Sequence, residues 1–108
     1  MNPTTYRVRR ATLDDLTTLR PIWESMRLRV PELEKRLTEF QVAEDSAGKV
    51  VGAVGFQMVE RQGLIHSEAL VDFAAADAVR PLFWERLQVL MVNHGISRAW
   101  TCEEAPFW

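Results

Sequence analysis

The sequence predicts an α+β domain with a mixed, mostly antiparallel sheet. Three strand-like segments follow one another in the middle of the chain, separated by short turns. Segments with apolar residues at helical spacing lie before and after these three strands. A further strand-like segment lies next to each of the helical segments. With 108 residues the chain is long enough to bury one core, so we expect a single domain over residues 1–108.

A strand and a capped helix are expected at the start of the chain. Residues 4–11 alternate between apolar and polar types, which is typical of a strand. Thr12 is the expected N-cap of the following helix, because its side chain can accept a hydrogen bond from a free backbone N–H. Asp14 and Asp15 place negative charge in the first turn, where it stabilises the helix dipole.

Prolines and glycines mark the next boundaries. Pro21 interrupts the apolar helical pattern and is expected to kink the helix or break it near Leu19. Pro31 is expected to open a second short helix. Gly48 and Gly63 are the expected turn residues of an antiparallel meander. Its three strands are expected at residues 39–45, 50–59 and 64–73.

A long helix and a last strand are expected in the final third of the chain. Asp77 is the expected N-cap of this helix, with Pro81 in the first turn. Gly95 is expected to end the helix, and residues 96–103 to form the last strand. The positions expected on the buried face of the helix are Val79, Phe83, Leu87, Leu90 and Met91.

The composition narrows the class of protein. A net charge of -2 does not suggest a nucleic-acid-binding protein. The apolar stretches are too short to span a bilayer and the start lacks a signal-peptide pattern, so we expect a cytoplasmic protein without a membrane segment. The single cysteine, Cys102, excludes an internal disulfide. His66, His94 and Cys102 match no common metal-ligand spacing, so no metal site is expected.

Four segments of the chain resemble the GNAT acyltransferase superfamily: "YRVRRATLDDLTTL", "VAEDSAGKVVGAVGF", "SEALVDF" and "APFW". The resemblance extends from Tyr6 to Trp108. It implies a GNAT-like fold with helices on both faces of the sheet, shortened at the C-terminus, because family members continue past "APFW" with a helix and further strands. It also implies an acyl-CoA-dependent N-acetyltransferase, whose acceptor would be a small-molecule or protein amine.

The resemblance places acetyl-CoA between the fourth and fifth strands and at the start of the following helix. The residues that it places at this cofactor are Leu70, Val71, Asp72, Val79 and Arg80. The family's pyrophosphate turn has the form Q/R-x-x-G-x-G/A, and its motif positions hold Ala76, Val79 and Pro81 here. A turn without glycine cannot bring its backbone as close to a phosphate, and Arg80 is the one obvious charge in it. We therefore expect acetyl-CoA to bind weakly or not at all.

The resemblance implies that Glu68 is the general base and that a backbone N–H of the same strand polarises the thioester carbonyl. The alternative for Glu68 is a solvent-facing carboxylate. His66, two positions earlier, is expected on the same strand face, where it shares a proton with Glu68 or forms part of a half-exposed polar face. The family's common general acid is a tyrosine, and the resemblance places Trp108 near its position. Tryptophan has no ionisable proton to donate. Cys102 is expected to be a small buried residue rather than a nucleophile.

Two functions from different classes remain open. The first is the N-acetyltransferase, and the second is a non-catalytic GNAT-fold module that binds a partner or a second copy of the chain. The segment "ISRAWTC" would form an apolar sheet edge with one charge, and such an edge pairs readily with another chain. We therefore expect a homodimer. The alternative is a monomer in which residues 103–108 fold back over that edge.

Overall fold

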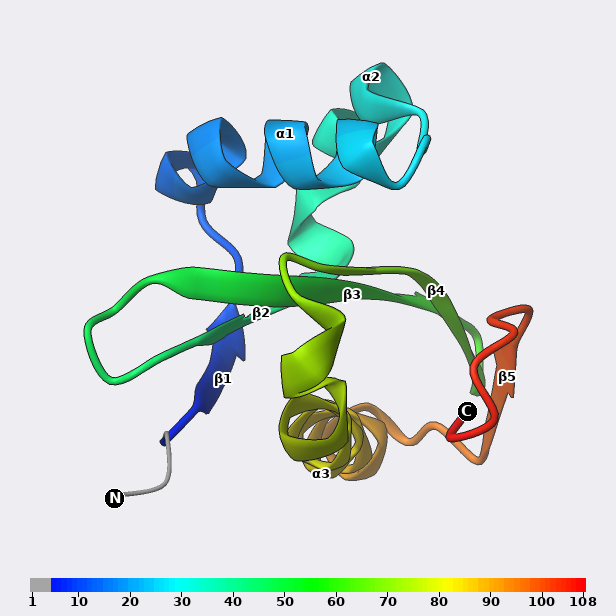
Figure 1. The fold of residues 1–108 in the computed structure, drawn as a ribbon. Helices are drawn as coiled ribbons and strands as arrows, with labels where there is room; N and C mark the ends of the chain where they lie inside the picture. Colours follow the sequence, from blue (N-terminus) through cyan, green and yellow to red (C-terminus); the bar gives the residue numbers. More distant parts are fainter. Residues whose placement is uncertain (1–4) are drawn as a thin grey trace.

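The computed structural model describes residues 5–108 and contains one five-stranded sheet in the order β1-β2-β3-β4-β5 (Figure 1). The strands are β1 (Arg7–Arg10), β2 (Phe40–Glu44), β3 (Val50–Val59), β4 (Gln62–Leu70) and β5 (Arg98–Thr101). The helices are α1 (Leu16–Ser25), α2 (Val30–Lys35) and α3 (Ala76–His94). Strands β1 to β4 pair antiparallel, whereas β5 pairs parallel with β4. The expected meander and mixed sheet are confirmed.

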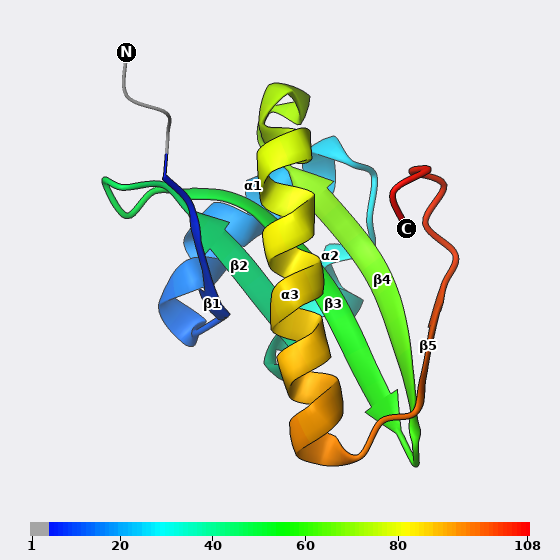
Figure 2. The same ribbon diagram turned by 90° about the horizontal axis from the view of Figure 1, so that it is seen from below.

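Helices cover both faces of the sheet, as the resemblance implies. The layer of α1 and α2 lies on one face and α3 on the other (Figures 1 and 2). Each face has its own core because the central strands are apolar on both sides. On the first face the ring of Trp23 packs against Phe40, with centroids 5.1 Å apart. On the second face Phe83 and Leu87 of α3 are fully buried in one cluster with Val54.

The first helix differs from its expected form. A 3₁₀ turn over Leu13–Asp15 precedes α1, and the side chain of Asp15 accepts a hydrogen bond of 2.7 Å from the backbone N–H of Thr12. The helix then continues through Pro21, so the expected break near Leu19 was wrong. The buried Leu19 side chain anchors α1 to the sheet, and such packing outweighs the one backbone hydrogen bond that a proline cannot make.

Of the glycines expected in a turn or at a helix end, Gly48 and Gly95 lie where they were expected. Gly48 has a φ of 82° in the β2–β3 turn and Gly95 has a φ of 65° at the end of α3. The β3–β4 turn instead uses Glu60, whose φ is 56°, so the assignment of Gly63 to this turn was wrong. Gly63 pairs inside the β3–β4 ladder, where a Cβ atom would collide with the ring of Phe56.

The start of α3 also differs from expectation. A 3₁₀ turn over Phe73–Ala75 precedes it, and the side chain of Asp72 caps this turn by accepting a hydrogen bond of 2.9 Å from the N–H of Ala74. Asp77 therefore lies inside the helix and is not its N-cap, and Pro81 lies beyond the first turn. The expected buried face is confirmed, with Val79, Phe83 and Leu87 fully buried and Leu90 and Met91 partly buried. In the described part of the chain, no helix has the length and apolar character needed to cross a membrane.

An ion-pair network joins β1, β2 and the first 3₁₀ turn at the sheet edge opposite β5. Arg9 donates to both carboxylate oxygens of Asp15 at 2.9 Å and to Glu44 at 3.0 Å. Hydrogen bonds from Arg9 hold the pKa of Asp15 below its usual value. Those from Arg7 and then Arg9 do the same for the pKa of Glu44. This network fastens the first strand to the rest of the sheet.

A β-bulge in β4 interrupts the alternation of its side chains. Ala53 of β3 pairs with Ala69, whereas Gly55 pairs with His66, so one residue of β3 lies opposite two residues of β4. Ser67 lies within this irregularity and has a left-handed φ of 53°, which is uncommon for a residue with a side chain. One extra residue in a strand moves the following side chains to the other face.

The bulge places His66 and Glu68 on opposite faces of the sheet. The ring of His66 packs edge-on against Phe40, in the layer of α1 and α2, with centroids 5.5 Å apart. Glu68 faces α3, where it bonds to Arg80. The expectation that both side chains share one face was therefore wrong, because it assumed an unbroken period of two.

Candidate functional site

The site implied by the resemblance lies where β4 and β5 separate. The two strands pair only between Gln62–Ile65 and Arg98–Thr101. Strand β4 then continues to Leu70. Residues 102–108, which we call the C-terminal segment, turn back beside this unpaired part of β4 (Figure 2). We call this region the fork. The start of α3 lies at the same end of β4, so the residues that were expected near a cofactor lie in the fork or next to it.

Glu68 lies in the fork as a buried, fully bonded carboxylate. Arg80 donates to it from Nη2 at 2.7 Å and from Nε at 3.1 Å to both oxygens. The indole Nε1 of Trp108 donates to Oε2 at 2.7 Å. Hydrogen bonds to Glu68 raise the pKa of Arg80, so the guanidinium stays charged. The solvent-facing alternative for Glu68 was wrong, and the lone pairs that a base would use already accept hydrogen bonds.

The backbone N–H of Glu68 is bonded as well. It donates to the side chain of Glu103, with 2.9 Å between the nitrogen and Oε1. Glu103 is held in turn, because its own N–H donates to the hydroxyl of Thr101 at 3.0 Å. A carboxylate oxygen therefore occupies the place next to the Glu68 amide. Nothing in the sequence marks Glu103 for this role, since the contact spans 35 positions of the chain and arises from the fold.

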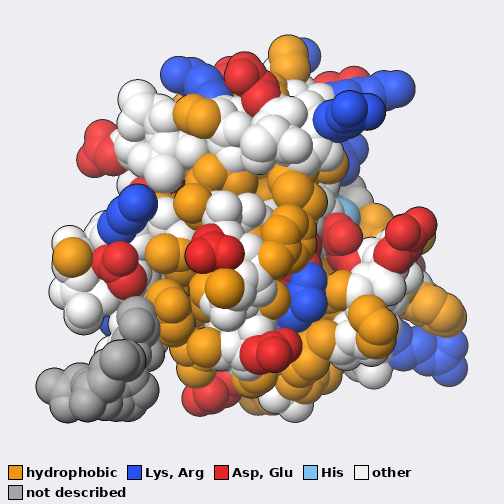
Figure 3. All heavy atoms as spheres, viewed as in Figure 1, with side chains coloured by type: hydrophobic (Ala, Val, Ile, Leu, Met, Phe, Trp, Pro, Cys, Tyr) orange, Lys and Arg blue, Asp and Glu red, His pale blue; other side chains and the backbone are white. Residues whose placement is uncertain are grey.

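The residues expected at acetyl-CoA have mainly structural partners. Leu70 and Val79 are buried in the core under α3. The N–H of Val71 donates to the carbonyl of Val51 at 2.8 Å, which extends the β3–β4 pairing. The Val71 side chain is half exposed, and hydrophobic side chains gather around the start of α3 (Figure 3). Arg80, the expected phosphate contact, uses its guanidinium on Glu68.

Asp72 occupies the position where a pyrophosphate would need free N–H groups. Its carboxylate accepts from the N–H of Ala74 at 2.9 Å, and its carbonyl accepts from the N–H of Ala75 at 3.0 Å. A second anion at this turn would compete with a carboxylate already bonded there and would be repelled by it. Together with Glu103 at the Glu68 amide, this means that the residues of the fork, as arranged, do not fit a bound acyl-CoA.

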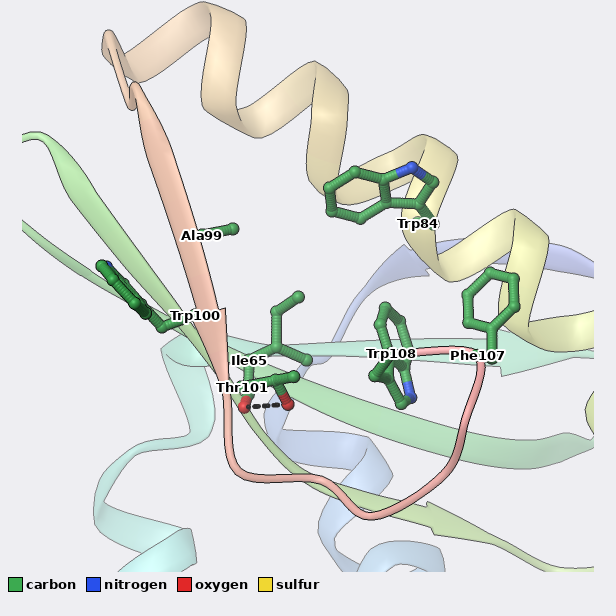
Figure 4. A pocket seen from close by; sticks show the side chains of 7 residues that line it. All are labelled: Ile65, Trp84, Ala99, Trp100, Thr101, Phe107 and Trp108. Carbon is green, nitrogen blue, oxygen red and sulfur yellow. Dashed lines mark hydrogen bonds between the residues drawn. The ribbon is translucent and has the colours of Figure 1, made fainter.

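Aromatic side chains enclose a pocket of about 370 Å³ next to the fork (Figure 4). Trp84 projects from α3 on one side, and Phe107 and Trp108 project from the C-terminal segment on the other (Figure 4). The rings of Phe107 and Trp108 meet edge to face, with centroids 5.1 Å apart. Trp100 of β5 also lines the pocket and is half exposed. The C-terminal segment thus closes the fork with apolar as well as polar contacts.

On the other face of β4, a hydrogen-bonded chain runs through His66. Its Nε2 lies 2.8 Å from Oε1 of Glu39, and its Nδ1 lies 3.0 Å from the hydroxyl of Ser67. Sequence reasoning missed both partners, because the chain depends on the bulge and on the 3₁₀ turn that precedes β2. Cys102 is exposed, so the expectation of a buried cysteine was wrong. Residues 5–108 contain no group of side chains suited to hold a metal ion.

Comparison with known proteins identifies the architecture. No protein-family model matches the chain, and no curated protein matches it. N-acetylglutamate synthase from Neisseria gonorrhoeae, solved with coenzyme A and L-arginine, has a TM-score of 0.79 and 17% identity, over 98% of this chain and 26% of that chain. Rv2747 from Mycobacterium tuberculosis, solved in complex with CoA, has a TM-score of 0.74 and 22% identity, over 87% of this chain and 62% of that chain. PaiA N-acetyltransferase from Thermoplasma acidophilum has a TM-score of 0.70 and 12% identity, over 85% and 75%.

The chain spans less than two thirds of the length of the first two of these structures. The resemblance stated from the sequence is confirmed at the level of the fold, and the chain has a GNAT fold.

Proposed function

We propose that this chain acts as a GNAT-fold binding module in which its own C-terminal segment fills the acyl-CoA groove. One observation carries the proposal: the backbone amide and the carboxylate of Glu68 both bond to that segment, to Glu103 and Trp108. The amide is the group that a thioester carbonyl would need, and the carboxylate is the group that an amine would need. Asp72 closes the remaining anion site at the start of α3.

The energetic consequence is a penalty on cofactor binding. A hydrogen bond to a charged group stabilises a protein by about 1.5–3 kcal/mol. Displacing both Glu103 and Trp108 therefore costs about 3 kcal/mol or more, which corresponds to a loss of about a hundredfold in affinity. We expect acetyl-CoA to bind this chain weakly or not at all.

The second candidate function is an N-acetyltransferase with an unidentified amine acceptor. Two observations favour it: the solved structures with this fold include an N-acetyltransferase with coenzyme A bound, and the Glu68 amide at the β4 bulge points out of the β3–β4 pairing toward Glu103 in the fork. In this proposal Glu68 is the general base, and Leu70, Val71, Asp72, Val79 and Arg80 lie along the cofactor. It requires the C-terminal segment to leave the fork.

Calorimetric titration with acetyl-CoA separates the two functions. The native chain is compared with the double variant Glu103→Ala and Trp108→Phe, which removes both bonds of the segment to Glu68 while keeping an aromatic ring. Glu104→Ala is the matched control, because Glu104 is exposed and next to Glu103. The binding-module proposal expects no sub-micromolar affinity in the native chain. Sub-micromolar binding by the native chain, or acetylation of an amine, would overturn it in favour of the enzyme.

We also propose that the chain forms a homodimer through β5. This strand lies at the sheet edge, and the indole of Trp100 on it is 55% exposed. The C-terminal segment does fold back, but it lies beside β4 and bonds to Glu68 (Figure 2). An edge strand with unpaired backbone groups and an exposed aromatic residue favours pairing with a second copy.

A further inference from the structure

The aromatic pocket beside the fork has room for a ligand although the fork itself is filled. Its volume of about 370 Å³ lies in the range of sites for small organic molecules. Neither Glu68 nor any residue that was expected at acetyl-CoA lines it. Trp84 of α3 lines it from one side, and Phe107 and Trp108 of the C-terminal segment line it from the other (Figure 4). The pocket is therefore a second site, next to the acyl-CoA groove and separate from it.

Most polar side-chain atoms around this pocket already have partners. The indole Nε1 of Trp108 donates to Glu68 at 2.7 Å, and that of Trp100 donates to a glutamine of β4 at 3.1 Å. The hydroxyl of Thr101 donates to a backbone carbonyl of β4 at 3.1 Å and accepts a backbone N–H of the C-terminal segment at 3.0 Å. The nitrogen of Trp84 lies on the edge of its ring that is turned away from Trp108 (Figure 4). A ligand that depends on hydrogen bonds, such as an anion or a primary ammonium ion, therefore finds few partners here.

The charge around the pocket favours a cation. The described side chains that line it carry no charge. Residues 102–108, which form one wall, contain Glu103 and Glu104 and no lysine or arginine. Arg80 in the fork is paired with Glu68, so these two charges compensate each other. The negative charge of the C-terminal segment therefore attracts a positive ligand and repels a negative one.

The aromatic rings supply the remaining attraction. The face of an aromatic ring carries partial negative charge, and it attracts a cation within about 6 Å of the ring centre, most strongly when the ring is tryptophan. Phe107 and Trp108 form a fixed pair of rings, with centroids 5.1 Å apart. Because Trp108 also donates a hydrogen bond to the carboxylate of Glu68, electron density shifts into its ring and the face becomes more negative.

We propose that this pocket binds a quaternary ammonium group, with Trp84, Phe107 and Trp108 around its methyl groups. Such a group carries a positive charge but no N–H, so it gives up no hydrogen bond when it leaves water for a pocket with few partners. For the same reason it cannot accept an acetyl group and is not an acceptor amine. The inference goes beyond the proposed function but rests on it in one respect: the C-terminal segment, which forms one wall, has to lie in the fork.

The test is a titration of the ¹⁵N-labelled full chain with choline, followed through the indole N–H signals of the tryptophans. Ethanolamine, a primary amine, and 3,3-dimethylbutan-1-ol, the uncharged isostere of choline, are the counterparts, and sodium chloride keeps the ionic strength constant. We expect choline to shift the signals of Trp84 and Trp108 and to bind about tenfold more tightly than either counterpart. The signal of Trp23, which is buried on the other face of the sheet, should not move.

Variants of the pocket and a control locate the site. Trp84→Leu and Phe107→Leu each remove a ring but keep an apolar side chain. We expect Trp84→Leu to weaken the binding of choline about tenfold and Phe107→Leu about threefold, because tryptophan attracts a cation more strongly than phenylalanine does. Trp84→Phe keeps a ring and should bind with an affinity between those of the native chain and Trp84→Leu. Phe73→Leu is the matched control and should bind as the native chain does, because Phe73 is 59% exposed and does not line the pocket.

The proposal is wrong if choline leaves the signals of Trp84 and Trp108 unmoved. It is also wrong if 3,3-dimethylbutan-1-ol binds as tightly as choline, since the pocket would then select apolar groups without regard to charge, or if both leucine variants bind choline as the native chain does. Acetyl-CoA is absent from every sample and is titrated separately. A chain that binds neither compound therefore contradicts this inference and leaves the binding-module proposal intact, whereas tight binding of acetyl-CoA contradicts the binding-module proposal whatever choline does.

Discussion

On the α3 face of β4 the polar groups around Glu68 form hydrogen bonds with one another. On the α2 face the hydrogen bonds that join Glu39, His66 and Ser67 end at an open pocket. In the fork, Arg80 and Trp108 donate hydrogen bonds to the carboxylate of Glu68, and the amide of Glu68 donates to Glu103. On the other face, His66 lies between Glu39 and Ser67, and His66 and Ser67 line the open pocket. Strand β4 therefore carries a closed site on one face and an open pocket on the other.

The bulge is the cause of this difference. In a regular strand, His66 and Glu68 would lie on one face, and their side chains would be neighbours. The extra residue at Ser67 separates them and gives each its own partner, Glu39 on one side and Arg80 on the other. The two sites can therefore be altered independently by single substitutions.

The largest expected effect is on the closed side. Glu68→Ala leaves Arg80 without a partner, although the guanidinium side chain is only 15% exposed. Breaking a buried ion pair in this way costs about 3 kcal/mol of unfolding free energy. Glu39→Ala is expected to cost about 1 kcal/mol, because it removes one partly buried hydrogen bond to His66. Urea denaturation measures both, and equal losses would contradict the distinction between the two faces.

The next effect comes from the bulge itself. Ser67→Val places a β-branched side chain at a φ of 53°, where it is strongly disfavoured. We expect a loss of about 2 kcal/mol in unfolding free energy. Ser67→Gly is the control, since glycine adopts this conformation without strain. A valine variant as stable as the glycine variant would mean that the strand can return to a regular register.

An ion pair away from β4 gives a reference for electrostatic effects. The pKa of Asp15 is lowered from 3.8 by hydrogen bonds from Arg9. This pair therefore stabilises the fold above that pH, and the contribution is lost as the pH falls through the lower pKa of the folded state. Asp15→Asn is expected to cost about 1 kcal/mol at neutral pH and nothing in strong acid. Asp14→Asn, at an exposed neighbour, should show no such pH dependence in thermal unfolding.

The smallest effect on folding is expected at β5. Trp100→Lys places a charge on the outer sheet edge, where the native indole is half exposed. We expect this variant to be monomeric and as stable as the native chain within about 0.5 kcal/mol. Light scattering at micromolar concentration reads the result. A native chain with the mass of one copy would contradict the dimer.

Much of the fold was predictable because it rests on local patterns. The meander follows from apolar segments between turns, and Gly48 and Gly95 mark their turns by the positive φ that glycine favours. The prediction failed where packing outweighs local preference. Pro21 lies inside α1 because the apolar face around it is buried, and Asp77 is not an N-cap because Asp72 caps an additional turn before it.

The site was less predictable, because its contacts join distant parts of the chain. Glu68 and Arg80 were both singled out, but for separate roles, and their pairing depends on how α3 crosses β4. Glu103 carries no local signal, since one carboxylate among many becomes specific only by its position in the fold. The bulge was equally hidden, because serine at Ser67 is not a residue type that marks a left-handed backbone.

The hydrogen bond from the Glu68 amide to Glu103 has a consequence for hydrogen–deuterium exchange. Amides in the middle of a sheet exchange through large openings of the fold, whereas an amide held by a side chain is released when that side chain leaves. The Glu68 amide sits in a central part of the chain but is held by a residue 35 positions away in the C-terminal segment. Its exchange rate therefore reports how often the fork opens, in the unmodified protein and without any ligand.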